Sequence, residues 1–273
     1  MPEPPQEISL LDSLQGNWFK LPLKAMREVG PAVQTLSALL NITSSQTFTA
    51  TSEISKRARL PLKTVYKHLA TLHEMGWIEN KHREKTRSGW LRRTATLAVT
   101  KKTRDNMSPY GFLPWWAACH VGYERVRPGS RDRRHTEKVC GYLPWSCKAV
   151  LSVWFAEFLR LVSVVQEQDD FDESDLLGTM NLIENIGGQE RFKFSLKNLT
   201  EQTGLSRETV VSAKRLLNHQ FGILRWFGRP PEKGVGTPTD YLGPNHEFRV
   251  IVTPVTETTC KISFRKGSGN GQS

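Results

Sequence analysis

Two short amphipathic segments joined by a tight turn lie within residues 50–80, and they restrict the possible folds more than any other feature of the chain. The first segment predicts a helix from Thr51, whose side chain can cap its first turn, to Ala58. A tight turn is expected at Arg59, and Pro61 then suits the first position of a second helix. The stretch therefore predicts two consecutive helices connected by only a few residues.

The second of these helices is amphipathic. Its apolar residues recur at i, i+4 and i+7, namely Val65, Leu69 and Leu72. When this stripe faces the core, Lys63 and Lys67 lie on the opposite face. Such a pair predicts a helix-turn-helix whose second helix can enter a DNA major groove. The alternative is an ordinary helical hairpin of a small core domain.

A strand, a basic loop and a second strand are expected directly after this helix. Gly76 suits the end of the helix, and an extended segment begins at Trp77. Residues 82–93 form a polar, basic loop, and residues 94–99 alternate in character as a strand does. This order predicts the wing of a winged helix, which contacts phosphates or the minor groove.

Residues 49–104 resemble the winged helix of the MarR family. The resemblance rests on SEIS at residues 52–55, on LPLKTVYKHLATLHEMGWIE at residues 60–79, and on the basic wing that ends in a strand. It implies a winged-helix fold, DNA binding and transcription regulation. The long dimerising helices of that family have no convincing counterpart in this chain.

The same pattern returns within residues 194–226, which contain the string LTEQTGLSRETV. Gly204 suits a left-handed position in the turn, and Ser206 can cap the second helix. The apolar residues expected to face inward from that helix are Val210, Ala213 and Leu217. A second wing is predicted from a strand at 224–227, a long loop and a return strand at 247–252. The second recognition helix is less cationic, so it either extends the DNA contact or serves packing and assembly.

These repeats predict a mainly α fold with small β-wings (α+β), built from two tandem winged helix-turn-helix domains. An apolar segment at 145–165 predicts a buried central helix of the second domain. The expected divisions are a disordered N-terminal lead at 1–16, winged-helix domain 1 at 17–105, a basic linker or arm at 106–141, winged-helix domain 2 at 142–255 and a disordered tail at 256–273. This two-domain architecture resembles plasmid replication initiators.

The middle region carries a near-repeat, GFLPWWA at 111–117 and GYLPWSC at 141–147. In each copy a helix can start at the Pro-Trp step. Between the copies lies a strongly basic segment at residues 123–138. One interpretation is a solvated hairpin or linker, and the other is a basic arm that lies along phosphates.

The overall charge favours a polyanionic partner. Lys and Arg number 38 against 27 Asp and Glu, which gives a formal net charge of +11. The four cysteines do not suggest a disulfide framework, and no segment resembles a signal peptide or a membrane span. We therefore expect a reduced, cytoplasmic, nucleoid-associated protein with no membrane contact.

Enzymatic and metal sites are not expected. The candidate zinc ligands lack a paired Cys-x₂-Cys unit; they are Cys119, His120, His135, Cys140 and Cys147. The acidic run at 167–175 is typical of a solvated start of a helix, and no Walker A string or nucleophile turn is present. The sequence therefore predicts no catalytic activity, no metal and no cofactor.

The predicted partner is double-stranded DNA, bound by one copy or by a homodimer or larger assembly. Base contacts are expected from the first recognition helix, at Lys63, Thr64, Lys67 and Thr71, flanked by Tyr66 and His68. Phosphate contacts are expected from the preceding helix and the wing, at Lys56, Arg57, Arg59, Arg83, Lys85, Arg87, Arg92 and Arg93. The second domain would contribute Arg207, Val211, Ser212, Lys214, Arg215, Arg229 and Lys233. These residues predict a transcriptional regulator, or alternatively a replication initiator or maintenance protein of a plasmid or other mobile element.

Overall fold

A computed structural model describes residues 6–9, 18–42, 50–81, 96–126, 136–166, 196–227, 241–244, 249–256 and 259–265. Among these residues helices predominate, and the strands form one five-stranded and three two-stranded sheets. The predicted mainly α fold with additional β structure is confirmed at this level, although the five-stranded sheet was not expected.

The N-terminal helices pack behind the helices of residues 50–80. They are α1 (Leu23–Val29), the 3-10 turn η2 (Gly30–Ala32) and α2 (Val33–Ile42). Helix α1 ends where it does because Gly30 adopts a left-handed φ of 54° and Pro31 follows it. Residues 32–39 are buried on every side, so α2 lies inside the molecule and supports the helices that follow.

The first helix pair consists of α3 (Thr51–Ala58) and α4 (Leu62–Glu74). Strands β3 (Ile78–Lys81) and β4 (Thr96–Val99) follow and pair antiparallel. The short helix α5 (Lys101–Asp105) comes next. This order confirms the predicted helices and the two strands after them.

A small sheet connects the N-terminal part of the chain to the central helix. Strands β2 (Trp18–Pro22) and β5 (Tyr110–Pro114) pair antiparallel, and the 3-10 turn η3 (Trp115–Ala118) follows β5. Helix α6 (Trp145–Gln166) packs against β5 so closely that a Cβ atom at Gly111 would lie 2.8 Å from the Ser152 hydroxyl. The turn η3 begins at Trp115 and α6 begins at Trp145, so a helical segment starts at each Pro-Trp step of the near-repeat, as predicted.

The second helix pair consists of α8 (Leu196–Thr203) and α9 (Arg207–Arg215), and a π-helical turn, η4 (Leu216–Gln220), extends α9. Strand β8 (Leu224–Phe227) then pairs with β9 (Tyr241–Pro244). Residues 249–252 of the predicted return strand are extended, within β10 (Arg249–Thr256), but the predicted pairing with the strand at 224–227 is wrong, because β10 pairs in another sheet.

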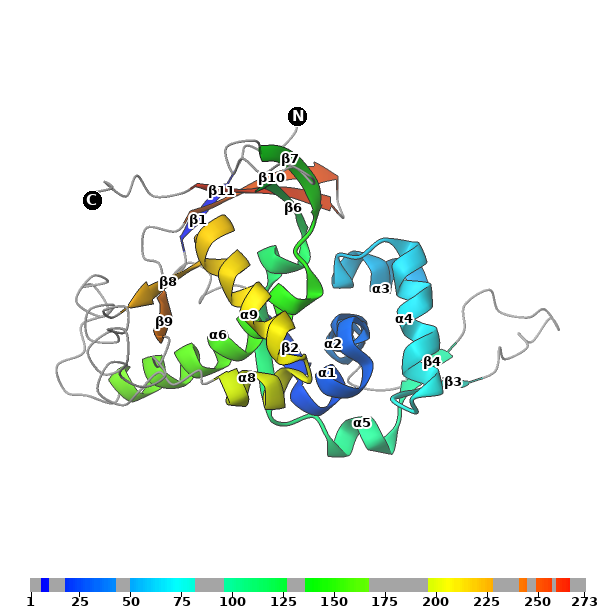
Figure 1. The fold of residues 1–273 in the computed structure, drawn as a ribbon. Helices are drawn as coiled ribbons and strands as arrows, with labels where there is room; N and C mark the ends of the chain where they lie inside the picture. The colour runs from blue at the N-terminus through cyan, green and yellow to red at the C-terminus, as the bar shows by residue number, and fades with distance from the viewer. Residues whose placement is uncertain are drawn as a thin grey trace, which may run out of the picture.

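That other sheet has five strands in the order β1-β10-β11-β6-β7 (Figure 1). Its remaining members are β1 (Gln6–Ser9), β11 (Thr259–Arg265), β6 (His120–Val126) and β7 (Thr136–Tyr142). The expected disorder is therefore wrong for β1 in the lead and for β11 in the tail. The expected linker at 106–141 is likewise wrong for β5, whereas the antiparallel pair of β6 and β7 agrees with the hairpin interpretation of the basic segment. Strands β1 and β5 pair only with segments from distant parts of the chain, and β11 pairs with β6 as well as with its neighbour β10, which local patterns cannot reveal.

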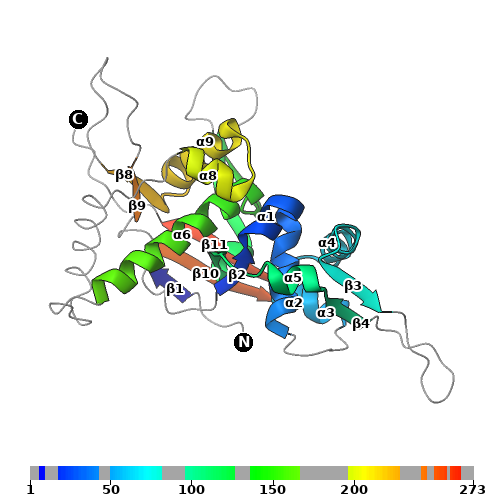
Figure 2. The same cartoon turned by 90° about the horizontal axis from the view of Figure 1, so that it is seen from below.

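One continuous hydrophobic core joins β2, α1, α2, both helix pairs, α6 and β8. Helix α6 is its centre, as predicted, with Trp154 packed edge-on against Phe155 and stacked on Phe158. Both views place α1 between the two helix pairs (Figures 1 and 2). The two pairs therefore belong to one packed body. Among the described residues, no helix meets the length and hydropathy needed to cross a bilayer.

Candidate nucleic-acid interface

The turn of the first helix pair is held by backbone and side-chain hydrogen bonds. Arg59 adopts a left-handed φ of 52°, and its N–H donates to the Lys56 carbonyl at 3.2 Å. The Leu60 N–H donates to the Ser55 carbonyl at 3.2 Å, and the Ser55 hydroxyl donates back to the Leu60 carbonyl at 2.6 Å. These bonds satisfy the last carbonyls of α3 and set the direction in which α4 leaves.

The boundaries of the two helices differ slightly from the prediction. The N-cap residues are Ala50 and Pro61, and neither makes a side-chain capping bond. Thr51 is therefore the first residue of α3, not its cap, and α4 begins one residue after the proline. The Pro61 ring still presets the backbone for entry into α4.

The two helix pairs share one turn geometry. In each pair the first helix has eight residues and three residues precede the second helix. The first residue of each turn is left-handed, Arg59 at φ 52° and Gly204 at φ 71°. Ser206 caps α9 by accepting a hydrogen bond from the Thr209 N–H, as predicted. The repeat inferred from sequence thus extends to the backbone of the turn.

Helix α4 presents the predicted cationic face to solvent. Val65 and Leu72 are fully buried and Leu69 is partly buried, which confirms the inward stripe. Lys63 and Lys67 are both exposed on the outer side. The face thus holds two cations at i and i+4, with no acidic residue between them.

The remaining predicted base-contacting residues of α4 divide into exposed and enclosed groups. Tyr66 is 57% exposed and lies beside the lysines. Thr64 and Thr71 are half-buried, and the Thr71 hydroxyl donates to the Lys67 carbonyl at 3.2 Å. The threonines are therefore less available for base contact than the prediction supposed.

His68 does not belong to the outer face, so its assignment to the interface is wrong. Its Nδ1 atom lies 2.8 Å from the Thr35 hydroxyl of α2. Burial, together with the positive charge of Lys148, lowers the pKa of His68 to about 4. The imidazole is therefore neutral at pH 7 and connects α4 to α2. Its i+3 spacing from Val65 was the available indication that it shares the buried stripe.

The cations of α3 have differing surroundings. Arg57 pairs with Glu53 at 2.7 Å, and both side chains are substantially exposed. The Arg59 guanidinium lies over the Trp115 ring, 4.9 Å from its centroid. Lys56 is exposed. Arg59 is thus oriented by an aromatic surface, and its predicted phosphate contact stays a prediction.

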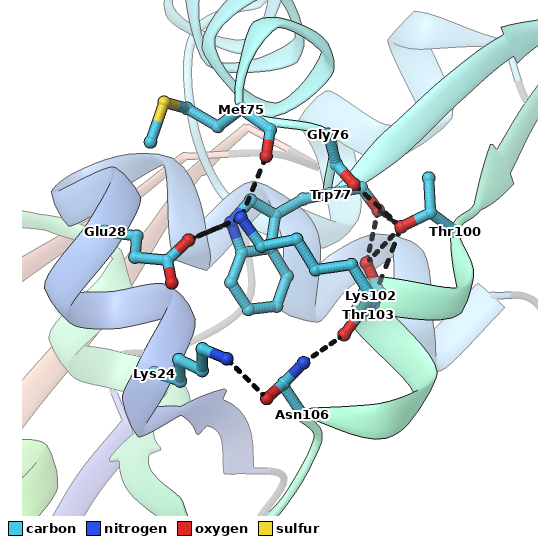
Figure 3. A network of polar contacts seen from close by, with 9 residues as sticks. All are labelled: Lys24, Glu28, Met75, Gly76, Trp77, Thr100, Lys102, Thr103 and Asn106. Carbon is cyan, nitrogen blue, oxygen red and sulfur yellow. Dashed lines mark hydrogen bonds and ion pairs between the residues drawn. The ribbon is translucent and has the colours of Figure 1, made fainter.

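A polar network fixes the end of α4 and the start of β3 (Figure 3). Gly76, with φ 70°, donates its N–H to the His73 carbonyl, and the Trp77 N–H donates to the Leu72 carbonyl at 2.8 Å. This is the double hydrogen bond of a Schellman motif, and it confirms the predicted glycine stop. The chain therefore turns sharply from α4 into β3.

The buried Trp77 is the centre of this network. Its indole N–H donates to the Glu28 carboxylate at 3.2 Å, and Lys102 forms an ion pair with the same oxygen at 2.6 Å. Lys102 also donates to the Met75 carbonyl, and its Nζ lies 4.8 Å from the Trp77 ring centroid (Figure 3). The hydroxyl of Thr100 and the hydroxyl of Thr103 each donate to the Trp77 carbonyl.

The same network sets the charge of Glu28. Burial by itself would raise the pKa of this carboxyl, but the hydrogen bond and charge of Lys102, the Trp77 indole and the charge of Lys24 outweigh it. The pKa of Glu28 therefore lies below its ordinary value, and the group stays ionised. Sequence reasoning missed this network because its members come from α1, α4 and α5.

The outer face of α9 carries two exposed cations, as does that of α4, but here an acidic residue accompanies them. Arg207, Ser212 and Arg215 are exposed, together with Glu208. Val211 is half-buried. Lys214 is only 4% exposed, so its predicted DNA contact is wrong. It lies next to buried Ala213 on the side of α9 that packs inward, where its long methylene stem can be covered.

The predicted wing cations lie outside the described residues. This applies to Arg83, Lys85, Arg87, Arg92 and Arg93 of the first wing and to Arg229 and Lys233 of the second. The strands that flank the first loop are described, with Ile78 opposite Val99 and Lys81 opposite Thr96. Lys81 and Thr96, the last described residues before and after the basic segment, therefore lie at the end of this sheet remote from Gly76.

Each helix pair is connected to the other half of the chain by hydrogen bonds, buried for the first pair and exposed for the second. Lys148 of α6 donates to Gln34, whose amide donates at 2.6 Å to the Ala58 carbonyl at the end of α3. Arg27 of α1 donates to the Glu201 carbonyl of α8 at 3.4 Å. A Cβ atom at Gly204 would lie 3.1 Å from the Arg27 Cα. Each turn is thus supported by an element from the other half.

From the sequence we predicted a buried apolar helix at 145–165 and assigned no role to Lys148 within it. A lysine in such a run was the available indication of a buried polar contact. Within the described part of the chain, no group of His, Cys, Asp and Glu has the arrangement of a metal site. Comparison of the chain with protein-family models, curated proteins and solved structures finds no match.

Proposed function

We propose that this chain binds double-stranded DNA through two tandem winged helix-turn-helix units and acts as a transcriptional regulator. The observation that carries the proposal is the outer face of α4. Exposed Lys63 and Lys67 lie opposite a fully buried apolar stripe, and a tight left-handed turn precedes the helix. A helix of this kind suits insertion into a major groove, with lysine as donor to guanine acceptors.

The wing adds a second element of contact. Strand β3 follows α4 and pairs with β4. The sequence between the two strands carries five cations against one acidic residue, Glu84. Phosphate contact by such a loop supplies affinity without sequence preference, while α4 supplies the preference. The net charge of +11 supports the same partner.

The second helix pair extends this site. Exposed Arg207, Ser212 and Arg215 can contact an adjacent segment of duplex, although Glu208 reduces the local charge. Because both pairs pack on one core, a single copy presents two unlike recognition helices in a constant relation. One chain can then occupy two neighbouring, unlike half-sites, and a homodimer or larger assembly on DNA is compatible with this.

A second candidate function is supported by that asymmetry. This candidate is a replication initiator or maintenance protein of a plasmid or other mobile element. Two unlike units fused through one core suit a directional site better than a palindrome. A genome-wide binding map separates the two uses: many promoters support the regulator, and one cluster of repeats in a single replicon supports the initiator.

The proposal is tested by titrating full-length protein against duplex DNA by fluorescence anisotropy. The double variant Lys63→Ala/Lys67→Ala should lose affinity by about tenfold or more, because each lost base or phosphate contact costs on the order of 1 kcal/mol. The matched control is Lys20→Ala/Lys101→Ala, which removes the same charge from exposed positions outside both helix pairs. Equal losses in the two double variants would show that α4 has no special role.

A further inference from the structure

The outer face of α4 carries a second row of side chains beside the lysines. Among the described residues, the exposed large hydrophobic side chains are Leu62 at 42%, Tyr66 at 57% and Met75 at 43%, and all three are on α4 or its C-cap. Leu62 and Tyr66 are at i and i+4, and exposed Ala70 continues the row at i+8. This row, residues 62, 66 and 70, runs parallel to that of Lys63 and Lys67.

The row occupies the part of the helix that would enter the groove. Leu62 is the first residue of α4, and the N-terminal residues of a recognition helix are those that reach base edges. A single exposed apolar residue needs no explanation, but an apolar row beside a cationic row matches one surface in particular. The major groove offers the 5-methyl groups of thymine next to the acceptor atoms of guanine.

We infer that Leu62 and Tyr66, continued by Ala70, contact thymine methyl groups in the major groove. The inference rests on the proposed function and specifies its DNA sites. Leu62 and Tyr66 are separated by roughly 6 Å along the helix axis, which corresponds to about two base-pair steps of roughly 3.4 Å each. The preferred site then contains two thymines about two steps apart, beside a guanine contacted by a lysine.

From the sequence we expected base contacts from Thr64 and Thr71. The inference instead assigns the contacts with thymine methyl groups to the row of residues 62, 66 and 70. Thr64 and Thr71 are half-buried, and the hydroxyl of Thr71 is bonded to the backbone of its own helix. Tyr66 extends further from the helix than either threonine and is more exposed. Charge complementarity favours DNA over a protein partner, because Lys63 and Lys67 border the row along its length.

The test begins with selection of bound duplexes from a randomised library by the full-length protein. Each thymine of the selected duplex is then replaced by deoxyuridine, which removes the methyl group and keeps the pairing. At one or two positions the dissociation constant should rise by about fourfold, the effect of one buried methyl group. In Tyr66→Ala or Leu62→Ala protein, replacing the thymine at the corresponding position should no longer raise the dissociation constant. The comparison is a double-mutant cycle between one side chain and one methyl group.

Met75→Ala is the matched control, because Met75 is as exposed as Leu62 but lies at the other end of the helix. It should keep the full sensitivity to deoxyuridine. Equal affinity of thymine and deoxyuridine duplexes at every position overturns the inference while leaving DNA binding intact. Sensitivity that persists unchanged in both Leu62→Ala and Tyr66→Ala overturns it as well, and points to a protein-docking role for the row. Failure to select any duplex would overturn the proposed function itself.

Discussion

Lys148 donates a hydrogen bond to the Gln34 side-chain carbonyl across 3.1 Å, in the interior between α6 and α2. The side-chain amide of Gln34 in turn donates to the Ala58 carbonyl at 2.6 Å, immediately before the left-handed turn at Arg59. Burial lowers the pKa of Lys148 to about 8, although the nearby Cys119 acts in the opposite direction. A largely charged lysine at neutral pH therefore lies inside the core, and it connects α6 to the first helix pair through Gln34.

Removing this lysine should destabilise the protein. We expect Lys148→Ala to lower the free energy of unfolding by about 2–4 kcal/mol, because it leaves a cavity and an unpaired amide. Lys148→Met fills the space and removes a buried charge, so it should cost less. Denaturant titrations of both variants measure this difference. Wild-type stability in Lys148→Ala would contradict the structural role of the contact.

Gly204 should tolerate alanine less well than Gly76 does. Both have a positive φ, 71° and 70°, so both share the conformational cost of about 1 kcal/mol or more. A Cβ atom at Gly204 would also lie 3.1 Å from the backbone of Arg27, whereas a Cβ at Gly76 meets nothing within 4 Å.

The difference in thermal midpoint between Gly204→Ala and Gly76→Ala therefore isolates the packing of α1 on the second turn. We expect Gly204→Ala to have the lower midpoint by several degrees. Equal midpoints would mean that α1 can move away from the turn at no cost.

The spacing of the two DNA half-sites should be fixed. Because both helix pairs share one core, they cannot follow half-sites that are moved apart. Inserting either about 5 or about 10 base pairs between the half-sites of a selected duplex should reduce affinity to that of one unit, by at least about tenfold. Anisotropy titrations check this. Recovery of affinity with the full-turn insertion would indicate a flexible connection instead.

Stability should fall on mild acidification because of His68. Its pKa is about 4 in the folded protein against 6.5 ordinarily, so between these values the unfolded chain binds about one more proton than the folded one. The unfolding free energy should therefore decrease as the pH falls from about 6.5 towards 4, and level off below.

A pH series of thermal midpoints for wild type and His68→Gln measures this contribution. The glutamine variant keeps a hydrogen-bonding group for Thr35 and should have a flatter profile above pH 5. Glu28 acts in a lower window: its depressed pKa adds stability above about 4.5 that is lost as the pH falls further. Identical profiles above pH 5 would show that His68 is not the responsible group.

Local patterns predicted the two helix pairs because their information is contained within about thirty residues. The 3.6-residue spacing of Val65 and Leu72, and the glycines at 76 and 204, act within one or two turns of helix. The same patterns failed for His68 and Lys214, since a polar residue near a boundary of the stripe can face either way. Only its tertiary neighbours decide which way it faces.

The sequence by itself determined the existence of two helix pairs, the two strands that follow the first pair, the central apolar helix and the basic charge. These depend on turn geometry and on burial of one helix face, both of which are local. The tertiary structure alone decided that Gln6–Ser9 and Thr259–Arg265 share a sheet with the middle of the chain, and that Lys148 and Arg27 each support the opposite turn. Contacts between residues more than a hundred positions apart leave no periodic trace, because each depends on how the whole core packs.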